Sequence, residues 1–144
     1  MRAVVQRVRE ASVEVDYKMI GSIKKGYLIY LGIHVNDTED IAKKCAQKIH
    51  QLRIFEDDNQ KMNLSLNAVD GEVLLISQFT LYGDTKGNNR PSFIEAARPE
   101  EAKPLYDLVC EELSKHHTVE KGVFGADMKV KSVNDGPVTI IIEL

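Results

Sequence analysis

Alternating and continuous apolar segments dominate the first third of the chain and predict β-strands. Ala11–Val15 alternates apolar and polar residues, which is typical of a strand with one buried face. Tyr27–Ile33 is almost continuously apolar, as expected of a strand that is buried on both faces. The polar segments Asp16–Lys18 and Lys24–Gly26 predict turns. This region is therefore predicted to form a sheet around a central strand at Tyr27–Ile33.

Two amphipathic helices are predicted from apolar residues at helical spacing. The first spans Thr38–Gln51, with Thr38 as its N-cap. Its apolar stripe consists of Ile41, Cys45, Ile49 and Leu52. The second opens at Pro99, although Pro104 lacks a backbone donor and predicts either a kink or a later start. Its stripe consists of Leu105, Leu108, Val109 and Leu113.

The remaining elements are predicted around polar interruptions. Asp70–Gly71 is a hairpin signal before a strand at Glu72–Thr80. Alternation in that strand places Ser77 and Gln78 on opposite faces, each with the residue two positions further on. Ser92–Glu95 fits the capping box of a short helix. The last strands are Met128–Lys131 and Val138–Leu144. This order of elements predicts a mixed α/β domain with helices on one face of a sheet.

Composition narrows the class of protein without naming a function. The chain of 144 residues suits one domain, and 43% hydrophobic with 28% charged residues excludes wholesale disorder. Nineteen basic residues stand against 22 acidic ones, so any nucleic-acid binding must come from a local patch. No secretory signal or membrane-spanning run is visible, and two distant cysteines suggest no disulfide. We therefore expect a cytoplasmic protein.

Histidine and cysteine residues give no sign of a metal site or a thiol nucleophile. The four histidines and two cysteines show neither His-x-x-x-His nor Cys-x-x-Cys spacing. Cys45 and Cys110 lie in or beside the predicted apolar stripes, where cysteine acts as a small hydrophobe. We therefore expect neither a metal nor a cofactor.

Two polar segments carry more information. Ser77–Thr80 places polar side chains late in an otherwise buried strand. Either they form cross-strand hydrogen bonds at a sheet rim, or Gln78 and Thr80 face a cavity at the strand end. Asn134–Pro137 predicts a turn, and its X-Pro bond can be cis. A rigid bend of this kind also presents backbone carbonyls in a fixed direction. Recognition by main-chain atoms alone is therefore an alternative to a simple turn.

Together these segments resemble the D-aminoacyl-tRNA deacylases, and the resemblance runs along the whole chain. It rests on Met1–Val8, Leu52–Asp57, Lys61–Ser65, Ser77–Leu81, Asp84–Phe93, Phe124–Met128 and Asn134–Thr139. Pattern and resemblance together predict an α/β fold: a single domain, residues 1–144, of mixed or antiparallel, barrel-like β-sheets with helices packed on one face.

The resemblance implies a cytoplasmic, homodimeric, metal-free esterase with its active sites at the subunit interface. Such an enzyme would hydrolyse D-aminoacyl-tRNA and mischarged glycyl-tRNA, releasing free amino acid and tRNA. Asn134, Gly136 and Pro137 would bind the substrate and select its handedness, with Gly136–Pro137 as a cis dipeptide inserted into the partner's pocket. Its carbonyl oxygens would hold the substrate amino group and collide with an L side chain.

The resemblance also implies that Ser77, Gln78, Phe79 and Thr80 are the catalytic residues. Backbone N–H groups around Gln78 and Phe79 are expected to stabilise the oxyanion. Thr80 is either a covalent nucleophile or a pocket residue, and we favour direct attack by water assisted by the terminal ribose hydroxyl because no neighbouring base is evident.

Arg7, Lys86 and Arg90 are candidates for tRNA contact on grounds of charge, with bonding inside the protein or simple solvation as the alternative for each. Two other functions stay open at this point. One is a nucleic-acid-binding module without relevant hydrolysis, and the other is an esterase for small molecules.

Overall fold

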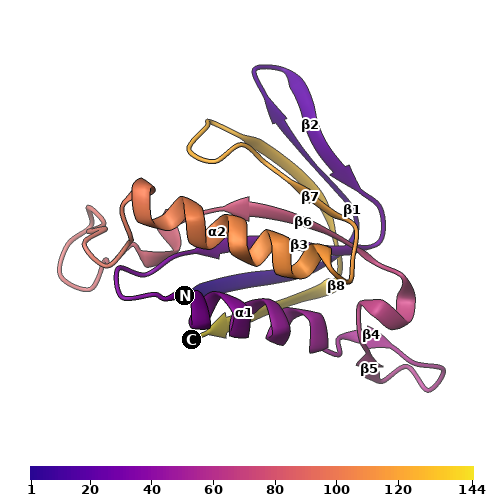
Figure 1. Cartoon of the computed structure of the whole chain (residues 1–144). Coiled ribbons are helices and arrows are strands. Elements are labelled where there is room, and N and C mark those ends of the chain that lie inside the picture. Colours follow the sequence, from indigo (N-terminus) through magenta and orange to yellow (C-terminus); the bar gives the residue numbers. More distant parts are fainter.

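The computed structural model describes all 144 residues as a bent sheet with two helices (Figure 1). Eight strands, two α-helices and two short 3₁₀ helices alternate along the chain. In order they are β1 (Arg2–Val15), β2 (Lys18–Ile23), β3 (Gly26–Gly32), α1 (Glu39–Gln51), β4 (Phe55–Glu56), β5 (Met62–Leu64), η1 (Asn67–Val69), β6 (Glu72–Ser77), η2 (Phe79–Tyr82), α2 (Pro99–Ser114), β7 (Val119–Lys121) and β8 (Lys129–Glu143).

Strand β1 organises the sheet because it pairs with three other strands. Its first half pairs with β3 and its second half with β2, while β8 runs antiparallel to it over nearly the whole length. Strand β6 adds to β3 in parallel, and β7 adds to β6 in parallel. The main sheet is therefore mixed, with the order β2-β1-β3-β6-β7 and β8 on the other edge of β1.

The sheet curls until its edges nearly meet, which gives the barrel-like form that the sequence predicts. On β2, a Cβ at Gly21 would lie 3.4 Å from the Cβ of Glu120, which belongs to β7. Where β3 pairs in parallel with β6, the two backbones approach even more closely. A Cβ at Gly26 would lie 1.8 Å from the carbonyl oxygen of Glu72, so only glycine fits there.

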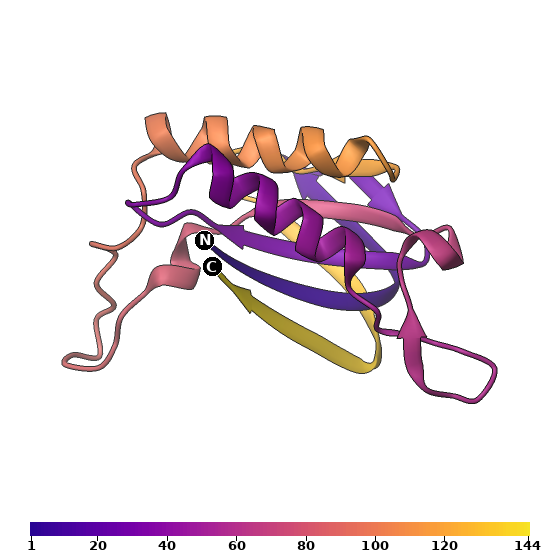
Figure 2. The same ribbon diagram turned by 60° about the horizontal axis from the view of Figure 1, so that its bottom comes forward.

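Both α-helices cover the same face of the sheet, as Figure 2 shows. The larger apolar core lies between helices and sheet, and a smaller one fills the inside of the curl, where Val8, Val13 and Leu74 meet. The hydroxyl of Tyr106 on α2 donates to the carbonyl of Leu75 at 2.7 Å, so α2 is also hydrogen-bonded to β6. The helices thus hold β6, whose end forms the candidate site, in a fixed position.

Several predicted elements are confirmed. The first helix has Thr38 as its N-cap, with the hydroxyl accepting from the N–H of Ile41 at 3.3 Å, and it ends at Gln51. The strand around Tyr27–Ile33 is central in the sheet, with partners on both sides. Helix α2 begins at Pro99 and continues through Pro104, so the later start considered for this helix is wrong.

Four local predictions are wrong. The strands predicted at Met128–Lys131 and Val138–Leu144 are parts of one strand, β8, and Asn134–Pro137 lies in a bulge of it and is no turn between two strands. Asp70–Gly71 is no hairpin, because β6 pairs in parallel with β3; Asp70 instead caps η1 in a left-handed conformation. Ser92–Glu95 forms no helix: Ser92 makes an isolated antiparallel bridge with Asp84, and Ile94 and Glu95 lie in a turn. The strand predicted to reach Thr80 ends at Ser77, and the chain then enters η2, so strand alternation does not apply beyond Ser77.

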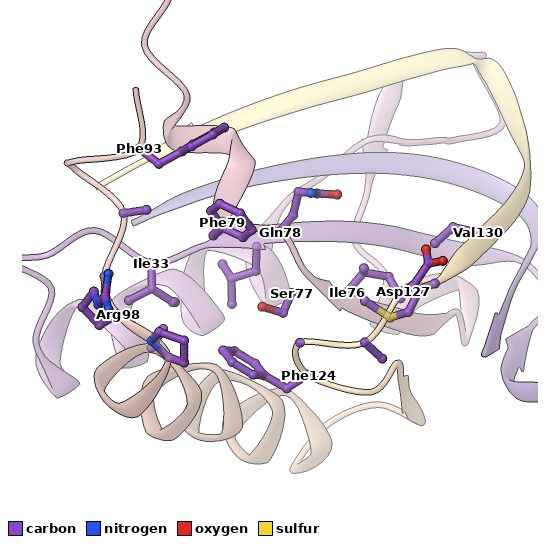
Figure 3. Close-up of a pocket in the computed structure, with 18 residues that line it drawn as sticks. Ile33, Ile76, Ser77, Gln78, Phe79, Phe93, Arg98, Phe124, Asp127 and Val130 are labelled. Carbon is purple, nitrogen blue, oxygen red and sulfur yellow. The ribbon is translucent and has the colours of Figure 1, made fainter. Parts of the chain in front are cut away.

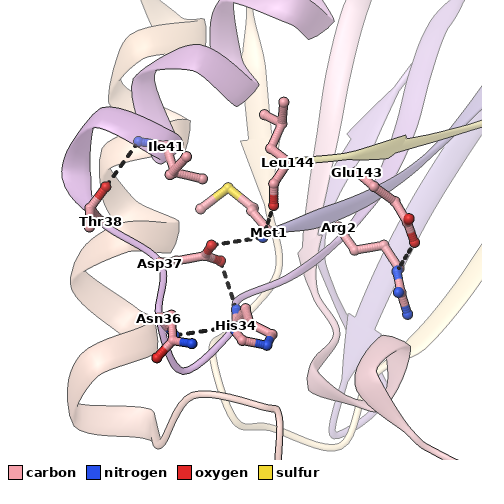
Figure 4. Close-up of polar contacts among 9 residues, drawn as sticks. All are labelled: Met1, Arg2, His34, Asn36, Asp37, Thr38, Ile41, Glu143 and Leu144. Atoms are coloured by element: carbon pink, nitrogen blue, oxygen red, sulfur yellow. Dashed lines mark hydrogen bonds and ion pairs between the residues drawn. The ribbon is translucent and has the colours of Figure 1, made fainter.

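The two ends of the chain lie side by side beneath the helices (Figure 4). The Met1 amino group donates to the carboxylate of Asp37 at 2.8 Å and to the carbonyl of Leu144 at 3.0 Å. Asp37 also accepts from the backbone N–H of His34 at 2.7 Å. Nearby, the guanidinium of Arg2 donates to the carbonyl of Leu81, which ties the start of β1 to η2.

Candidate active site

A cavity of about 600 Å³ opens where β6 ends (Figure 3). Its walls come mainly from three parts of the chain: the end of β6 with the start of η2, the segment before α2 with the first turn of that helix, and the loop between β7 and β8. Leu31 and Ile33 at the end of β3, and Val130 of β8, complete the lining. The lining includes Ser77, Gln78, Phe79, Phe93, Arg98 and Asp127. Of the predicted catalytic residues, the structure brings Ser77, Gln78 and Phe79 to this cavity, and Thr80 does not line it.

The end of β6 is shaped by a change from apolar to polar residues. The apolar residues Val73–Ile76 are fully buried, and Ser77 is the last to pair with β3, opposite Leu31. The N–H of Gln78 donates to the carbonyl of Leu31 at 2.8 Å. That N–H is therefore already used and does not serve as the oxyanion donor predicted around Gln78. Phe79 and Thr80 open η2, where the first N–H groups have no partner inside the helix.

The other two walls are held against the same edge of the sheet. The N–H of Ala97 donates to the carbonyl of Ile33 at 2.9 Å, which fixes the segment before α2 at the end of β3. The ring of Phe124 packs 5.8 Å from that of Tyr106 on α2. Phe79 and Phe93 form an edge-to-face pair with ring centroids 5.1 Å apart, although 55% and 38% of their surfaces stay exposed.

The cavity holds few groups that can move a proton. Its lining is mostly apolar and includes no histidine, cysteine or lysine side chain. The two charged residues in it are Arg98 and Asp127, and Asp127 pairs with Lys129 at 2.9 Å. The hydroxyl of Thr80 lies outside the lining and accepts from the side-chain amide of Gln78 at 2.5 Å. No ionisable side chain is hydrogen-bonded to Thr80 that would activate it as a nucleophile.

The second predicted motif lies in a bulge of β8. The peptide bond between Gly136 and Pro137 is cis, and both residues are exposed. Gly136 has a φ of 127°, and a Cβ there would lie 2.7 Å from Val138 Cγ2, so the position requires glycine. Asn134 braces the bulge from inside: its side-chain oxygen accepts from the N–H of Val138 at 3.2 Å.

Within one chain this motif does not reach the cavity. The bulge faces Arg7 on β1, whereas Ser77 pairs with Leu31, which in turn pairs with Ala3. Four residues along the strands and three strand spacings across the sheet separate the two places, about 13 Å and about 14 Å respectively. Accordingly, neither Gly136 nor Pro137 lines the cavity.

Arg7, one of the predicted tRNA contacts, is buried with only 6% of its surface exposed. Its guanidinium donates to the carbonyl oxygens of Asp135 at 3.1 Å and Ile54 at 2.8 Å. This placement favours the alternative of bonding inside the protein, where Arg7 fixes the bulge of β8. Lys86 and Arg90 are exposed on the loop that joins η2 to Phe93. Of these three residues, Phe93 lines the cavity.

Three histidines form a cluster that spacing in the sequence does not reveal. His50 at the end of α1 hydrogen-bonds to His117 at 2.8 Å and stacks on His116 at 4.1 Å. Burial is the main cause that lowers the pKa of both His50 and His117, and the neighbouring imidazoles lower it further. The cluster borders another cleft and contributes nothing to the cavity at β6.

Metal ligation and thiol chemistry find no support in the side-chain arrangement. No group of three or more His, Cys, Asp or Glu side chains is placed to hold a metal ion. Burial raises the pKa of the Cys45 thiol to about 12, so this thiol stays protonated near neutral pH. No helix has the length and apolar character needed to cross a bilayer.

Comparisons with known proteins find the same family, and the matches cover nearly the whole chain. A family model described as D-Tyr-tRNA(Tyr) deacylase matches residues 4–143. Proteins named D-aminoacyl-tRNA deacylase are similar to it: that of Sulfurihydrogenibium sp. (strain YO3AOP1) is 54% identical over 143 residues, covering 99% of this chain and 97% of the relative. That of Lactobacillus gasseri (strain ATCC 33323) is 50% identical over 145 residues, covering 100% of both. The solved structure of a c-Myc DNA Unwinding Element Binding Protein superposes with a TM-score of 0.94 at 40% identity, covering 100% of this chain and 99% of that one.

Replacing Arg7 by Gln is expected to lower the free energy of unfolding by about 2 kcal/mol, because two buried carbonyl groups lose a charged donor. Urea denaturation measures this. Faster amide exchange at Val138, which is hydrogen-bonded inside the bulge, is expected as the local effect. Arg9→Gln on the same strand removes an exposed arginine and is the control, with a change within about 0.5 kcal/mol. Equal effects of the two substitutions would contradict a bracing role for Arg7.

Proposed function

Since the chain belongs to the D-Tyr-tRNA(Tyr) deacylase family of hydrolases, we propose that it hydrolyses the ester bond of D-aminoacyl-tRNA and of mischarged glycyl-tRNA. The products are tRNA and the free amino acid. The observation that carries the proposal is the pairing of a mainly apolar cavity with a rigid main-chain motif elsewhere on the surface. The cavity has no histidine, cysteine or lysine side chain, and its one carboxylate, that of Asp127, is paired with Lys129. Rejection of L-aminoacyl-tRNA is part of the proposal.

Selection by handedness is assigned to Gly136–Pro137 of a second subunit. Its carbonyl oxygens accept from the substrate ammonium group and fill the space that an L side chain would need. A D-residue or glycine places only hydrogen there, so both enter. The conformation of Gly136, which no other residue fits, and the hydrogen bonds from Arg7 and to Asn134 support this assignment because a steric filter must be stiff.

Hydrolysis proceeds by direct attack of water on the ester carbonyl. The water oxygen bonds to the carbonyl carbon, and the terminal ribose oxygen leaves with a proton when the tetrahedral intermediate collapses. The absence of histidine, cysteine and lysine from the cavity favours a proton route through the neighbouring ribose hydroxyl. The N–H groups of Phe79 and Thr80, which open η2, are the candidates for stabilising the oxyanion, since that of Gln78 is taken.

The same geometry supports a homodimer as part of the proposal. The cavity and the Gly136–Pro137 motif are too far apart to meet within one chain, so each complete site needs a second copy. Exposed apolar side chains on β8, Val133 with 44% and Ile141 with 64% of their surfaces exposed, favour a protein partner on this strand. A twofold dimer makes two equivalent sites, each with the cavity of one subunit and the motif of the other.

Contact with the tRNA body is assigned to Lys86 and Arg90, which are exposed on the loop next to the cavity wall. Their attraction to phosphates predicts an affinity that falls as salt rises. Because tRNA is used in the cytoplasm, we assign the enzyme to that compartment.

A second candidate function is nucleic-acid binding without hydrolysis. It is favoured by the similarity to a solved protein named for binding a DNA unwinding element. The net charge of −3 gives it no general support, because sequence-independent binding to DNA depends on excess positive charge. Activity on substrates separates the two functions, and also separates them from an esterase for small molecules.

Hydrolysis of D-Tyr-tRNA, L-Tyr-tRNA and a free D-Tyr ester under one set of conditions tests the proposal. We expect the D-Tyr-tRNA to be cleaved with a kcat/KM at least about a hundredfold above that of the L-Tyr-tRNA. The free ester is expected to be a poor substrate. Equal cleavage of both enantiomers would refute the steric filter, cleavage of the free ester alone would indicate a small-molecule esterase, and binding without cleavage would indicate a nucleic-acid-binding module.

Replacing Thr80 by Ala is expected to reduce kcat by no more than about tenfold, because only a hydrogen bond with Gln78 is lost. Single-turnover rates on D-Tyr-tRNA measure this, with Thr80→Ser as the control that keeps the hydroxyl. Complete loss of turnover with intact substrate binding would show instead that Thr80 is a covalent nucleophile.

Mixing two inactive variants tests whether sites are shared between subunits. Gly136→Val disrupts the motif, and Ala126→Phe fills the cavity, so each homodimer is expected to be inactive. Co-expressed subunits are expected to regain about a quarter of the wild-type activity, because half of the dimers then hold one complete site. Folded variants that regain nothing, or a monomer by light scattering, would contradict shared sites.

A further inference from the structure

Arg98 is the one cationic side chain that lines the cavity, and nothing in the chain neutralises it. The residue directly precedes α2 and is exposed. Its guanidinium takes part in none of the side-chain ion pairs of the protein. Figure 3 places Arg98 at one end of the cavity and Asp127, already paired with Lys129, at the other. The cavity therefore has one positive end with free donors.

The guanidinium, and no other feature, makes that end suitable for an anion. The neighbouring start of α2 offers little, because Pro99 has no N–H and Glu100 and Glu101 already occupy the first turn. An anionic ligand at this end of the cavity must therefore bind to Arg98 itself. The planar guanidinium can donate two parallel hydrogen bonds to a phosphate group, which an ammonium group cannot do.

Aromatic surface in the same cavity indicates what kind of anion fits. Phe79 and Phe93 line the cavity together with Arg98 and keep exposed ring surface (Figure 3). Exposed aromatic rings in one cavity with an arginine combine a stacking surface for a base with a partner for a phosphate. A simple carboxylate would use the cation alone, whereas a polynucleotide end uses both.

We propose that Arg98 binds a phosphodiester of the tRNA acceptor strand, and that this contact makes the enzyme specific for polynucleotide esters over aminoacyl esters of single nucleosides. This inference rests on the proposed function, because the cavity must accept the aminoacyl end of the same strand. Arg98 is then a binding residue with no part in proton transfer. It contributes affinity for the strand, while the D-selective motif acts on the aminoacyl group.

The experiment compares two minimal substrates that differ by one phosphodiester: the 3′-D-tyrosyl ester of adenosine and the 3′-D-tyrosyl ester of the dinucleotide CpA. Wild type is expected to prefer the dinucleotide. In Arg98→Gln, that preference in kcat/KM is expected to fall by about tenfold, the usual effect of losing a charged hydrogen bond. Arg98→Lys is expected to recover only part of it. Lys61→Gln, an equal loss of charge at the distant β4–β5 turn, is the control and is expected to keep the preference (Figure 1).

Failure of this inference differs visibly from failure of the proposed function. If wild type cleaves neither D-ester and also leaves full-length D-Tyr-tRNA intact, the proposed function is wrong. If it cleaves only D-Tyr-tRNA, one phosphodiester does not confer the specificity, and the inference alone is overturned. If wild type cleaves both and Arg98→Gln loses activity equally on the two, or on neither, Arg98 does not bind the phosphodiester. A shift from dimer to monomer in Arg98→Gln would assign the side chain to the subunit contact and would also overturn the inference. With full-length D-Tyr-tRNA, the salt dependence of log KM is expected to weaken by about one unit of slope in Arg98→Gln.

Discussion

The pairing of β1 with three strands is the constraint on which the rest of the protein depends. It fixes β3 on one side and β8 on the other, so the end of β6 and the bulge of β8 are held at opposite parts of one curved sheet. Both helices pack on one face of that sheet. The proposed site uses both places and would therefore be formed by two copies of the fold.

The regular elements were predictable because their residues repeat with the period of the element. The stripe containing Cys45 and Ile49 marks α1, and the apolar run around Leu28 marks β3. The wrong predictions concern segments whose conformation is determined by pairing with strands distant in the sequence. Asp70 looks like part of a hairpin only if the next strand is antiparallel, and it is parallel. Strand β6 ends at Ser77 because its pairing with β3 ends there. The local sequence pattern contains no information on where that pairing ends.

The candidate site was predictable in its motifs and less so in the use of each residue. Gln78 lines the cavity as the cavity interpretation required, but Thr80 does not, and Ser77 and Phe79 line it as well because the strand ends at Ser77. The N–H of Gln78 is taken by β3, a contact between residues far apart in the chain. Arg7 resembles a surface cation in sequence because burial cannot be read from charge. Arg98 gave no signal at all, since a lone arginine before a helix is common on protein surfaces.

The left-handed backbone at Gly136 also affects how the protein tolerates mutation. Any missense change in a glycine codon adds a Cβ, and at this position that atom would overlap Val138 and crowd Arg7. The main-chain carbonyl groups, by contrast, are retained in any substitution that leaves the backbone conformation unchanged. Apart from Arg7 and Asn134, which brace the bulge, side chains around it can therefore vary more freely than the codon of Gly136.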